Sequence, residues 1–252
     1  QGRLRQVLVA YAQRSPSVGY VQGMGLLAAL LLVVVEDTET AFWCLAAVIE
    51  RRLPPHYFDR ELLGSRVEMG LFERLLDALL PQVAAKLQAY GVPAELFATR
   101  WFVGLFAGTL PTETLLRVWD AFVVEGARVL LRVALSLVKI SEPRLLGCSD
   151  QHQLLCTLQE EQASCLDAER LLLLCFGKRT FLRAFATCDV HALRQEQLRR
   201  LRREAGNASD GTDAGLEDER TSSEEEAVDA GTDFEMVSRD DTHTPIGPPG
   251  AL

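Results

Sequence analysis

The first residues with a recognisable chemical spacing are the glycines of the run Gly23-Met24-Gly25-Leu26-Leu27-Ala28. This order matches the glycine pattern of dinucleotide-binding enzymes, in which the backbone approaches a pyrophosphate at the start of a helix. That chemistry requires a β-strand before the glycines, and no stretch before Gly23 alternates as a strand does. We therefore favour the other interpretation, which is close packing of helices at small residues.

The histidines and cysteines lack the spacing of a metal site or of a catalytic nucleophile. The sequence contains no His-Glu-x-x-His pair, Gly-x-Ser-x-Gly elbow or Cys-x-x-Cys pair. Most cysteines lie in apolar helical patterns, which predicts buried free thiols of a reducing compartment and not disulfides. No cofactor and no metal are expected. The residues concerned are His56, His152, His191 and His243, and Cys44, Cys148, Cys156, Cys165, Cys175 and Cys188.

The elements that would position a site are predicted to be helices throughout. Apolar residues recur at helical spacing between Pro, Gly and Asp/Ser breaks, and alternating strand patterns are absent. The run 22–35 is apolar all round, which predicts a helix inside the bundle. Its 13 residues from Gly23 to Val35 are fewer than the ~18–20 that cross a bilayer. Helices are expected at about 4–11, 22–35, 38–52, 66–79, 82–90, from 93, 110–126, 127–140, 150–162, 167–175, 178–187 and 189–203.

Charge and composition divide the 252-residue chain into a folded body and an acidic tail. The formal charge is −9, but residues 204–252 hold 14 Asp/Glu and two Arg, a net of −12. The remaining residues, with 21 acids and 24 bases, carry +3 and no general footprint for nucleic acid. Beyond Glu204 the composition changes to Gly, Ser, Thr, Asp and Glu with few large apolar residues to bury, so the tail 204–252 is predicted to be disordered.

Several motifs together resemble one known family, the TBC domains that activate Rab GTPases. The stretch Leu8 to Gly19 predicts a helix and a turn, and it leads into Tyr20-Val21-Gln22-Gly23-Met24. The family usually has Cys where this chain has Val21. The resemblance covers about residues 1–187 and leaves 188–203 as a basic C-terminal helix. The pattern of the chain is similar to that of the compact TBC proteins of the growth-hormone-regulated and Armus kind. The motifs downstream are Ala41-Phe42-Trp43, Thr99-Arg100-Trp101-Phe102, Leu110-Pro111, Arg117-Val118-Trp119-Asp120 and Glu125-Gly126.

The resemblance implies an all-α, multi-helix TBC array that acts on the GTP form of a Rab GTPase in vesicle traffic. It assigns to Gln22 the role of a finger inserted into the GTPase site. One amide can accept from the hydrolytic water and donate to phosphate. Tyr20 and Gly23 would set the loop that carries Gln22, although ordinary turn chemistry would also explain both. GTP and Mg²⁺ would belong to the partner.

The remaining motif residues are predicted to support this loop. Trp43, Trp101, Trp119 and Phe102 are expected in the core. Arg100, Arg117 and Asp120 are harder to bury unless they are paired. We therefore expect an ion pair or hydrogen-bonded network among these three, fixing the helices around the Gln22 loop.

The family's second finger, an Arg within Ile-x-x-Asp-x-x-Arg upstream of Gln22, does not occur in this sequence. Arg3 and Arg5 precede Gln22 but stand in no such motif, so the chain is expected to be an N-terminally truncated TBC domain. The leading hypothesis is a GTPase activator, which is cytoplasmic and reaches endomembranes through the Rab. An inactive Rab-binding or scaffolding domain is the alternative, and a nucleotide-binding enzyme is a third.

Two C-terminal features suggest further partners. Arg194, Arg199, Arg200, Arg202 and Arg203 could meet phosphates or acidic lipids, but cations at a helix C-terminus are also favourable against its dipole. In the acidic tail, Phe234-Glu235-Met236-Val237 resembles the short motif that docks on ubiquitin-like autophagy proteins by adding an edge strand.

Overall fold

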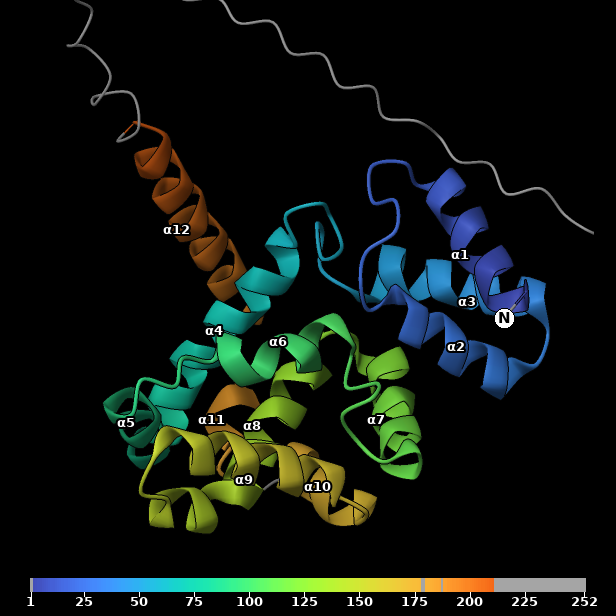
Figure 1. Cartoon of the computed structure of the whole chain (residues 1–252). Coiled ribbons are helices and arrows are strands. Elements are labelled where there is room, and N and C mark those ends of the chain that lie inside the picture. The colour runs from blue at the N-terminus through green and yellow to red at the C-terminus, as the bar shows by residue number, and fades with distance from the viewer. Residues whose placement is uncertain (1, 178–179, 187, 211–252) are drawn as a thin grey trace, which may run out of the picture. The chain divides into compact units, whose positions relative to one another are not determined.

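The computed structural model describes residues 2–177, 180–186 and 188–210, and in these residues every regular element is a helix (Figure 1). The all-α prediction is therefore confirmed. The helices are α1 (Gly2–Arg14), α2 (Met24–Val35), α3 (Thr38–Ala47) continuing into the π-helical turns of η1 (Val48–Arg52), α4 (Leu63–Leu79), α5 (Pro81–Ala89), α6 (Glu95–Val103), α7 (Thr112–Glu125), α8 (Arg128–Gly147), α9 (Gln151–Ala163), α10 (Ala168–Phe176), α11 (Arg183–Ala186) and α12 (Val190–Asp210).

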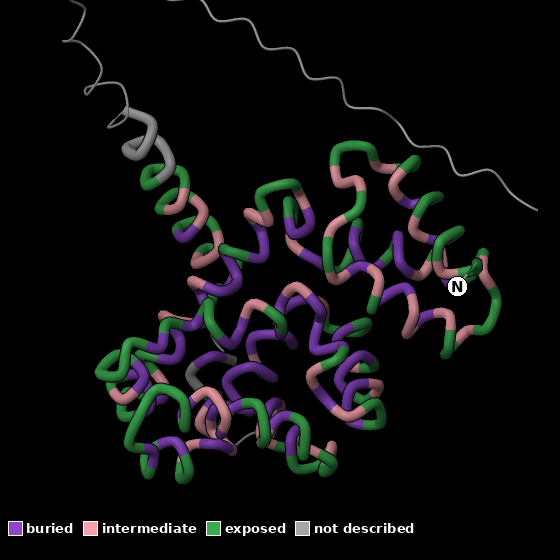
Figure 2. The backbone as a smooth tube through the Cα atoms, viewed as in Figure 1, coloured by how far each residue is buried: buried purple, intermediate pink, exposed green. Residues whose placement is uncertain are grey.

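The centre of the core is α8. Its residues Leu130, Leu131, Ala134 and Leu135 are fully buried, and their spacing covers more than one face of the helix. Helices α4, α5, α6, α7, α9 and α10 all pack on α8, which is accordingly purple along most of its length in Figure 2. A helix that is buried on several sides needs neighbours on several sides, and α8 has them.

Helix α2, predicted to lie inside the bundle, is buried on one side only. Leu27, Ala28 and Leu31 face α1 and α3, whereas Leu26, Val33 and Val34 are 51%, 74% and 54% exposed. The prediction was wrong for the outer face of this helix. An apolar composition shows that a helix could be buried all round, but not how many neighbours the chain provides.

Most helix boundaries follow the expected signals. Asp37 caps α3 by accepting a hydrogen bond from the Thr40 amide at 2.7 Å. Gly91 and Gly126, with φ of 65° and 81°, follow α5 and α7 in the left-handed half of backbone space that glycine tolerates. The predicted ends of these helices are confirmed.

Three boundaries differ from the sequence prediction. Helix α8 continues through Pro143 to Gly147, because Leu145 is fully buried there. A helix was expected over 178–187, and the described residues of this range form only the single helical turn α11. Helix α12 runs to Asp210, so residues 204–210, predicted to belong to a disordered tail, continue the helix. Low hydrophobicity does not end a helix whose preceding turns are already held by tertiary contacts.

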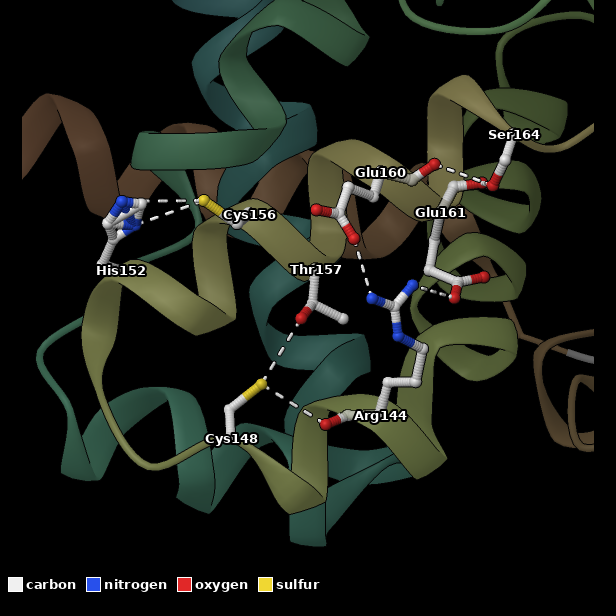
Figure 3. A network of polar contacts seen from close by, with 8 residues as sticks. All are labelled: Arg144, Cys148, His152, Cys156, Thr157, Glu160, Glu161 and Ser164. Atoms are coloured by element: carbon white, nitrogen blue, oxygen red, sulfur yellow. Dashed lines mark hydrogen bonds and ion pairs between the residues drawn. The ribbon is translucent and has the colours of Figure 1, made fainter.

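An ion-pair network holds the end of α8 on α9 (Figure 3). Arg144 donates to Glu160 and to Glu161, both at 2.7 Å. Beside this network the Cys148 thiol lies 3.4 Å from the Thr157 hydroxyl, and the Cys156 thiol lies 3.2 Å from Nδ1 of His152. The contacts of Arg144 and Cys148 fasten the turn of α8 that follows Pro143, whereas the His152–Cys156 contact lies within α9.

All six cysteines are free thiols, as predicted. Their burial is lower than expected, because only Cys148 and Cys175 are buried and the other four are half-buried. Burial raises the pKa of the Cys175 thiol to about 12. This thiol is therefore protonated at neutral pH and unreactive.

Helix α12 is anchored on α4 by a buried ion pair. Glu68 is fully buried, and its two carboxylate oxygens accept from Nε and Nη2 of Arg194, the latter at 2.9 Å. Burial raises the pKa of Glu68, and Arg194 opposes that rise. Arg194, one of the five arginines considered for phosphate binding, is thus engaged inside the fold.

We predict that Arg194→Met destabilises the protein by about 3–5 kcal/mol at pH 7, because it leaves a buried carboxylate without its cation. The pKa of Glu68 should then rise further, so the carboxyl is protonated at a higher pH in the variant than in the parent. The difference in stability is therefore largest at neutral pH and shrinks as the pH falls. Urea unfolding at pH 7 and pH 5 measures both effects.

Arg74→Met is the matched control, since Arg74 pairs with Glu196 at 3.1 Å across the same helices but with both side chains exposed. Its loss should be only about 0–1 kcal/mol. Equal losses for the two variants, or a loss for Arg194→Met that grows on acidification, would contradict the assignment.

Candidate functional site

The side chain of Gln22 is exposed in the turn that precedes α2, one residue before Gly23 and two before the helix begins. Met24 is fully buried directly behind it, and its sulfur accepts a hydrogen bond from the Val21 amide at 3.4 Å. The Met24 amide in turn donates to the Val21 carbonyl at 3.1 Å. The residues on both sides of Gln22 are thereby tied to each other while its amide group points to solvent.

Gly23 lets this turn lie directly on the end of α6. Its φ is 106°, and an added Cβ would lie 2.8 Å from Cγ1 and 2.9 Å from the carbonyl oxygen of Val103. Real Cβ atoms do not approach other atoms so closely, and the carbonyl belongs to the backbone and cannot swing aside. Glycine is therefore required here on two grounds, its backbone angle and the available space.

The segment that receives Gly23 is itself held rigidly. Leu105 and Phe106 follow α6 with positive φ of 46° and 65°, a strained conformation for side-chain-bearing residues. Trp119 of α7 donates its indole N–H to the Leu105 carbonyl at 3.0 Å, and the Tyr57 hydroxyl donates to the Phe102 carbonyl at 2.8 Å. These two buried bonds fix the chain on either side of Val103.

The expected core aromatics are confirmed with one exception. Trp101, Phe102 and Trp119 are 1%, 0% and 6% exposed, and the Trp101 indole donates to the buried Gln162 side chain at 2.8 Å. The hydrogen bonds of both indoles explain why tryptophan stands at these positions. Tyr57 and Gln162 lie in none of the motifs that the sequence singled out.

Trp43 is the exception, because its ring is 51% exposed on α3. The Arg14 guanidinium lies 5.2 Å from the ring centroid, and Arg14 also donates to both carboxylate oxygens of Glu50 at 2.9 and 3.1 Å. That bond lowers the pKa of Glu50. The core prediction for Trp43 was wrong, since helical spacing alone does not show that this face of α3 lacks a neighbour.

The predicted network of Arg100, Arg117 and Asp120 does not form. All three side chains are exposed, and no ion pair or hydrogen bond joins them in the described part of the chain. Arg117 and Asp120 lie on the outer face of α7, opposite the buried Val118 and Trp119. A helix packed on one side leaves such charges in water, so they require no partner.

Two surface features flank Gln22. Tyr20 is 60% exposed, and with Leu4, Leu8 and Val9 it lines a shallow apolar groove on α1. On α2, Leu26 reaches Gly108, where an added Cβ would lie 3.5 Å from Cδ1 of Leu26.

Gly108 also borders a hollow of about 240 Å³ that is lined by Leu96 and Arg100. Exposed apolar groups therefore lie near the glutamine turn, and Arg100 lines the hollow that Gly108 borders.

The described residues contain no group of three or more His, Cys, Asp or Glu side chains arranged to hold a metal ion. They also contain no strand ahead of the glycine run 23–28, which begins α2 after a loop. The dinucleotide interpretation therefore lacks the βαβ unit that it requires. No helix among the described residues is long and apolar enough to span a bilayer. The Phe234–Val237 motif lies outside the described residues.

Comparison with known proteins identifies the family. A family model described as the Rab-GTPase-TBC domain matches residues 1–146. TBC1 domain family member 2A of Mus musculus is 36% identical over 200 residues, which cover 79% of this chain and 20% of that protein. Growth hormone-regulated TBC protein 1 of Xenopus laevis is 43% identical over 139 residues, covering 55% of this chain and 40% of that protein.

Solved structures agree. The flagellar RabGAP TBC domain of Chlamydomonas superposes with a TM-score of 0.64 at 34% identity, covering 69% of this chain and 58% of that one. The Ypt/Rab-GAP domain of Gyp1p has a TM-score of 0.59 at 18% identity, covers 68% of this chain and 62% of that one, and supports the fold alone.

The helical array and the Tyr-x-Gln-Gly-Met turn set on the end of α6 define an all-α domain of the TBC type. The chain belongs to the Rab-GTPase-TBC domain family. It spans about a fifth of the length of its mouse relative.

We predict that Gly23→Ala destabilises the protein by about 1–3 kcal/mol more than Gly19→Ala does, because only the former forces a Cβ into Val103. Gly19 also has a positive φ, of 65°, but an added Cβ would have no atom within 4 Å. Its substitution therefore costs only backbone strain, about 1–2 kcal/mol. Thermal unfolding of both variants provides the comparison, and equal losses would show that Gly23 is needed for its backbone angle alone.

Proposed function

We propose that this chain is the glutamine-finger part of a GTPase-activating domain that acts in trans on a Rab-family GTPase. The single observation that carries the proposal is an exposed Gln22 on a turn that Gly23, Met24 and Val103 hold rigid. Hydrolysis of GTP requires a water held in line with the γ-phosphate, and positioning is the main task of such an activator. The carbonyl of Gln22 would accept from that water, and its NH₂ group would donate to phosphate.

The surface around Gln22 supports contact with a macromolecule. Tyr20, Leu26 and Leu96 are 60%, 51% and 57% exposed, and aromatic and apolar side chains of this kind form the centres of protein interfaces. The rim residue Arg100 would meet polar groups of the GTPase. GTP and Mg²⁺ are brought by the partner, and endomembranes would be reached through the Rab.

Two of the arginines ahead of Gln22, Arg3 and Arg14, are engaged within the fold, and this proposal assigns the second finger to none of them. Arg3 donates to the carbonyls of Leu32 and Glu36 at the C-terminal end of α2, where a cation is favourable against the helix dipole. Arg14 is engaged by Glu50 and stacked on Trp43. These engagements favour a Rab-binding module without catalytic power as the alternative for residues 1–252 alone.

Gln22→Ala, made in a chain that carries both fingers, should lower Rab GTP hydrolysis by about 10²-fold or more, because the water loses its positioning group. The melting temperature should stay nearly unchanged, since the side chain is exposed. Single-turnover hydrolysis across a panel of purified Rab proteins measures the rate. Gln13→Ala, an exposed glutamine on α1, is the control and should leave the rate unaltered. A fully active Gln22→Ala variant would remove Gln22 from the mechanism.

Residues 1–252 by themselves should accelerate hydrolysis weakly or not at all. An arginine finger offsets charge that develops on the phosphates and contributes about 10³- to 10⁵-fold in rate. Activity should appear when the family's Ile-x-x-Asp-x-x-Arg segment is added upstream, and it should disappear again when that Arg is changed to Ala. Binding to a GTP-loaded Rab without acceleration would support the alternative. Full activity of residues 1–252 would refute the two-finger proposal.

A further inference from the structure

The hollow of about 240 Å³ beside Gly108 is walled by one face of α6, by the last turns of α9 and by the turn at Gly108 and Thr109. Sites that enclose a whole small ligand have volumes of about 300–1,000 Å³. A hollow below that range has room for a single side chain.

A tryptophan fixes the orientation of the amide of Gln162 in this hollow. Gln162 is 5% exposed, and its Oε1 accepts a hydrogen bond from the Trp101 indole at 2.8 Å. An indole nitrogen can only donate, so the oxygen of the amide must face Trp101. The NH₂ group is therefore the part of the amide that this bond leaves over.

The NH₂ group of Gln162 has no acceptor. It donates no hydrogen bond to any of the described residues. A few side-chain atoms of the described residues are sealed from water without a partner, and this nitrogen is not among them. Because Gln162 lines the hollow, an acceptor placed there can reach its N–H groups. Donors in nearly buried residues are normally hydrogen-bonded, so this one calls for a ligand atom.

The charge in the lining of the hollow is positive. Arg100 is exposed, and no ion pair or hydrogen bond from the described residues engages its guanidinium. No Asp or Glu lines the hollow. Glu160 and Glu161, which precede Gln162 on α9, are both paired with Arg144. The lining therefore presents one cation without a counter-ion.

These donors match a carboxylate. A guanidinium binds a carboxylate through two parallel N–H groups, and the amides of Gln162 and Gln159 add further donors. One carboxylate balances the charge of Arg100, whereas a phosphate monoester, with about −1.5 to −2, would leave an excess. Leu96 and Phe97 also line the hollow and offer apolar contact to the methylene groups of an acidic side chain.

The hollow lies next to the surface that carries Gln22. Gly108 is part of its wall, and an added Cβ at Gly108 would lie 3.5 Å from Cδ1 of Leu26. Leu26 belongs to the first turn of α2, directly after the Gln22 turn. A polypeptide that docks over Gln22 and Leu26 therefore has the hollow within reach of its side chains.

We infer that this hollow binds the carboxylate of an acidic side chain of the polypeptide that docks on the Gln22 surface. The carboxylate pairs with Arg100 and accepts from the NH₂ group of Gln162. That this polypeptide is the GTPase rests on the proposed function, whereas the recognition of a carboxylate does not. Arg100 and Gln162 would then select among partners and take no part in hydrolysis.

The carboxylate is tested by titrating isotope-labelled residues 1–252 with Gly/Ser peptides that carry one central Glu or, as its uncharged isostere, Gln. Both peptide termini are blocked, so the Glu side chain is the only carboxylate. The NH₂ signals of Gln162 should shift and saturate with the Glu peptide and not with the Gln peptide. The indole signal of Trp119, which does not line the hollow, is the internal reference.

Arg100→Gln should weaken binding of the Glu peptide about tenfold, because it removes a hydrogen bond between two charged groups. The variant should fold, since the side chain is exposed. Arg117→Gln is the matched control, an exposed arginine on α7 outside the hollow, and it should change the affinity by less than about twofold. The inference fails if the Gln peptide shifts Gln162 equally, if the two variants weaken binding alike, or if the Glu peptide gives no saturating shift.

The source of the carboxylate is tested separately, by binding of residues 1–252 to GTP-loaded Rab proteins. Arg100→Gln should weaken this binding about tenfold and Arg117→Gln should not. Equal binding by the parent and Arg100→Gln would overturn the assignment of the carboxylate to the GTPase. The peptides contain no GTPase, so a failed titration would leave the role of Gln22 intact, and a failure of GTPase activation would leave the titration valid.

Discussion

The approach of Gly23 to the Val103 carbonyl is the contact on which the geometry of the candidate site depends. An added Cβ would lie 2.9 Å from this carbonyl oxygen and 2.8 Å from Cγ1 of Val103, so the backbone of the α2 turn lies directly against Val103 at the end of α6. Everything that fixes Val103 therefore also fixes Gln22. Tyr57 and Trp119 donate hydrogen bonds to the flanking carbonyls, and both of these side chains are buried. The backbone of the exposed Gln22 is thus positioned by buried groups, although no hydrogen bond from the described residues holds its side-chain amide.

Sequence reasoning succeeded where local chemistry decides the outcome. The Asp37 cap, the glycines after α5 and α7, and burial of Trp101 and Trp119 all follow from residue type and spacing. Gly23 and Met24 could be named within a motif, but the sequence did not show that their partners are Val103 and the Val21 amide. Those contacts depend on which helices meet, and helical periodicity does not contain that information.

Three of the failures share one physical cause. The predictions for Trp43, for the outer face of α2 and for the Arg100–Arg117–Asp120 network all assumed that these residues are buried. The actual neighbours of α2 and α3 are few, so Trp43 and Val33 lie in solvent. Arg100, Arg117 and Asp120 need no partners because water satisfies them. Conversely, the fully buried Glu68 was not anticipated, since its partner Arg194 is 126 residues away and lies in a stretch that resembles an ordinary basic helix end.

The Glu68–Arg194 pair also determines how much of the chain constitutes one folding unit. The family match ends at residue 146, inside α8, whereas the cation that Glu68 requires comes from α12. A protein that ended at residue 146 would keep the buried Glu68 carboxylate but lose the Arg194 guanidinium that pairs with it. It would also expose the faces of α8 on which α9 and α10 pack. The thermodynamic domain is therefore larger than the segment that the family model matches, and expression boundaries drawn from that model alone would cut through its core.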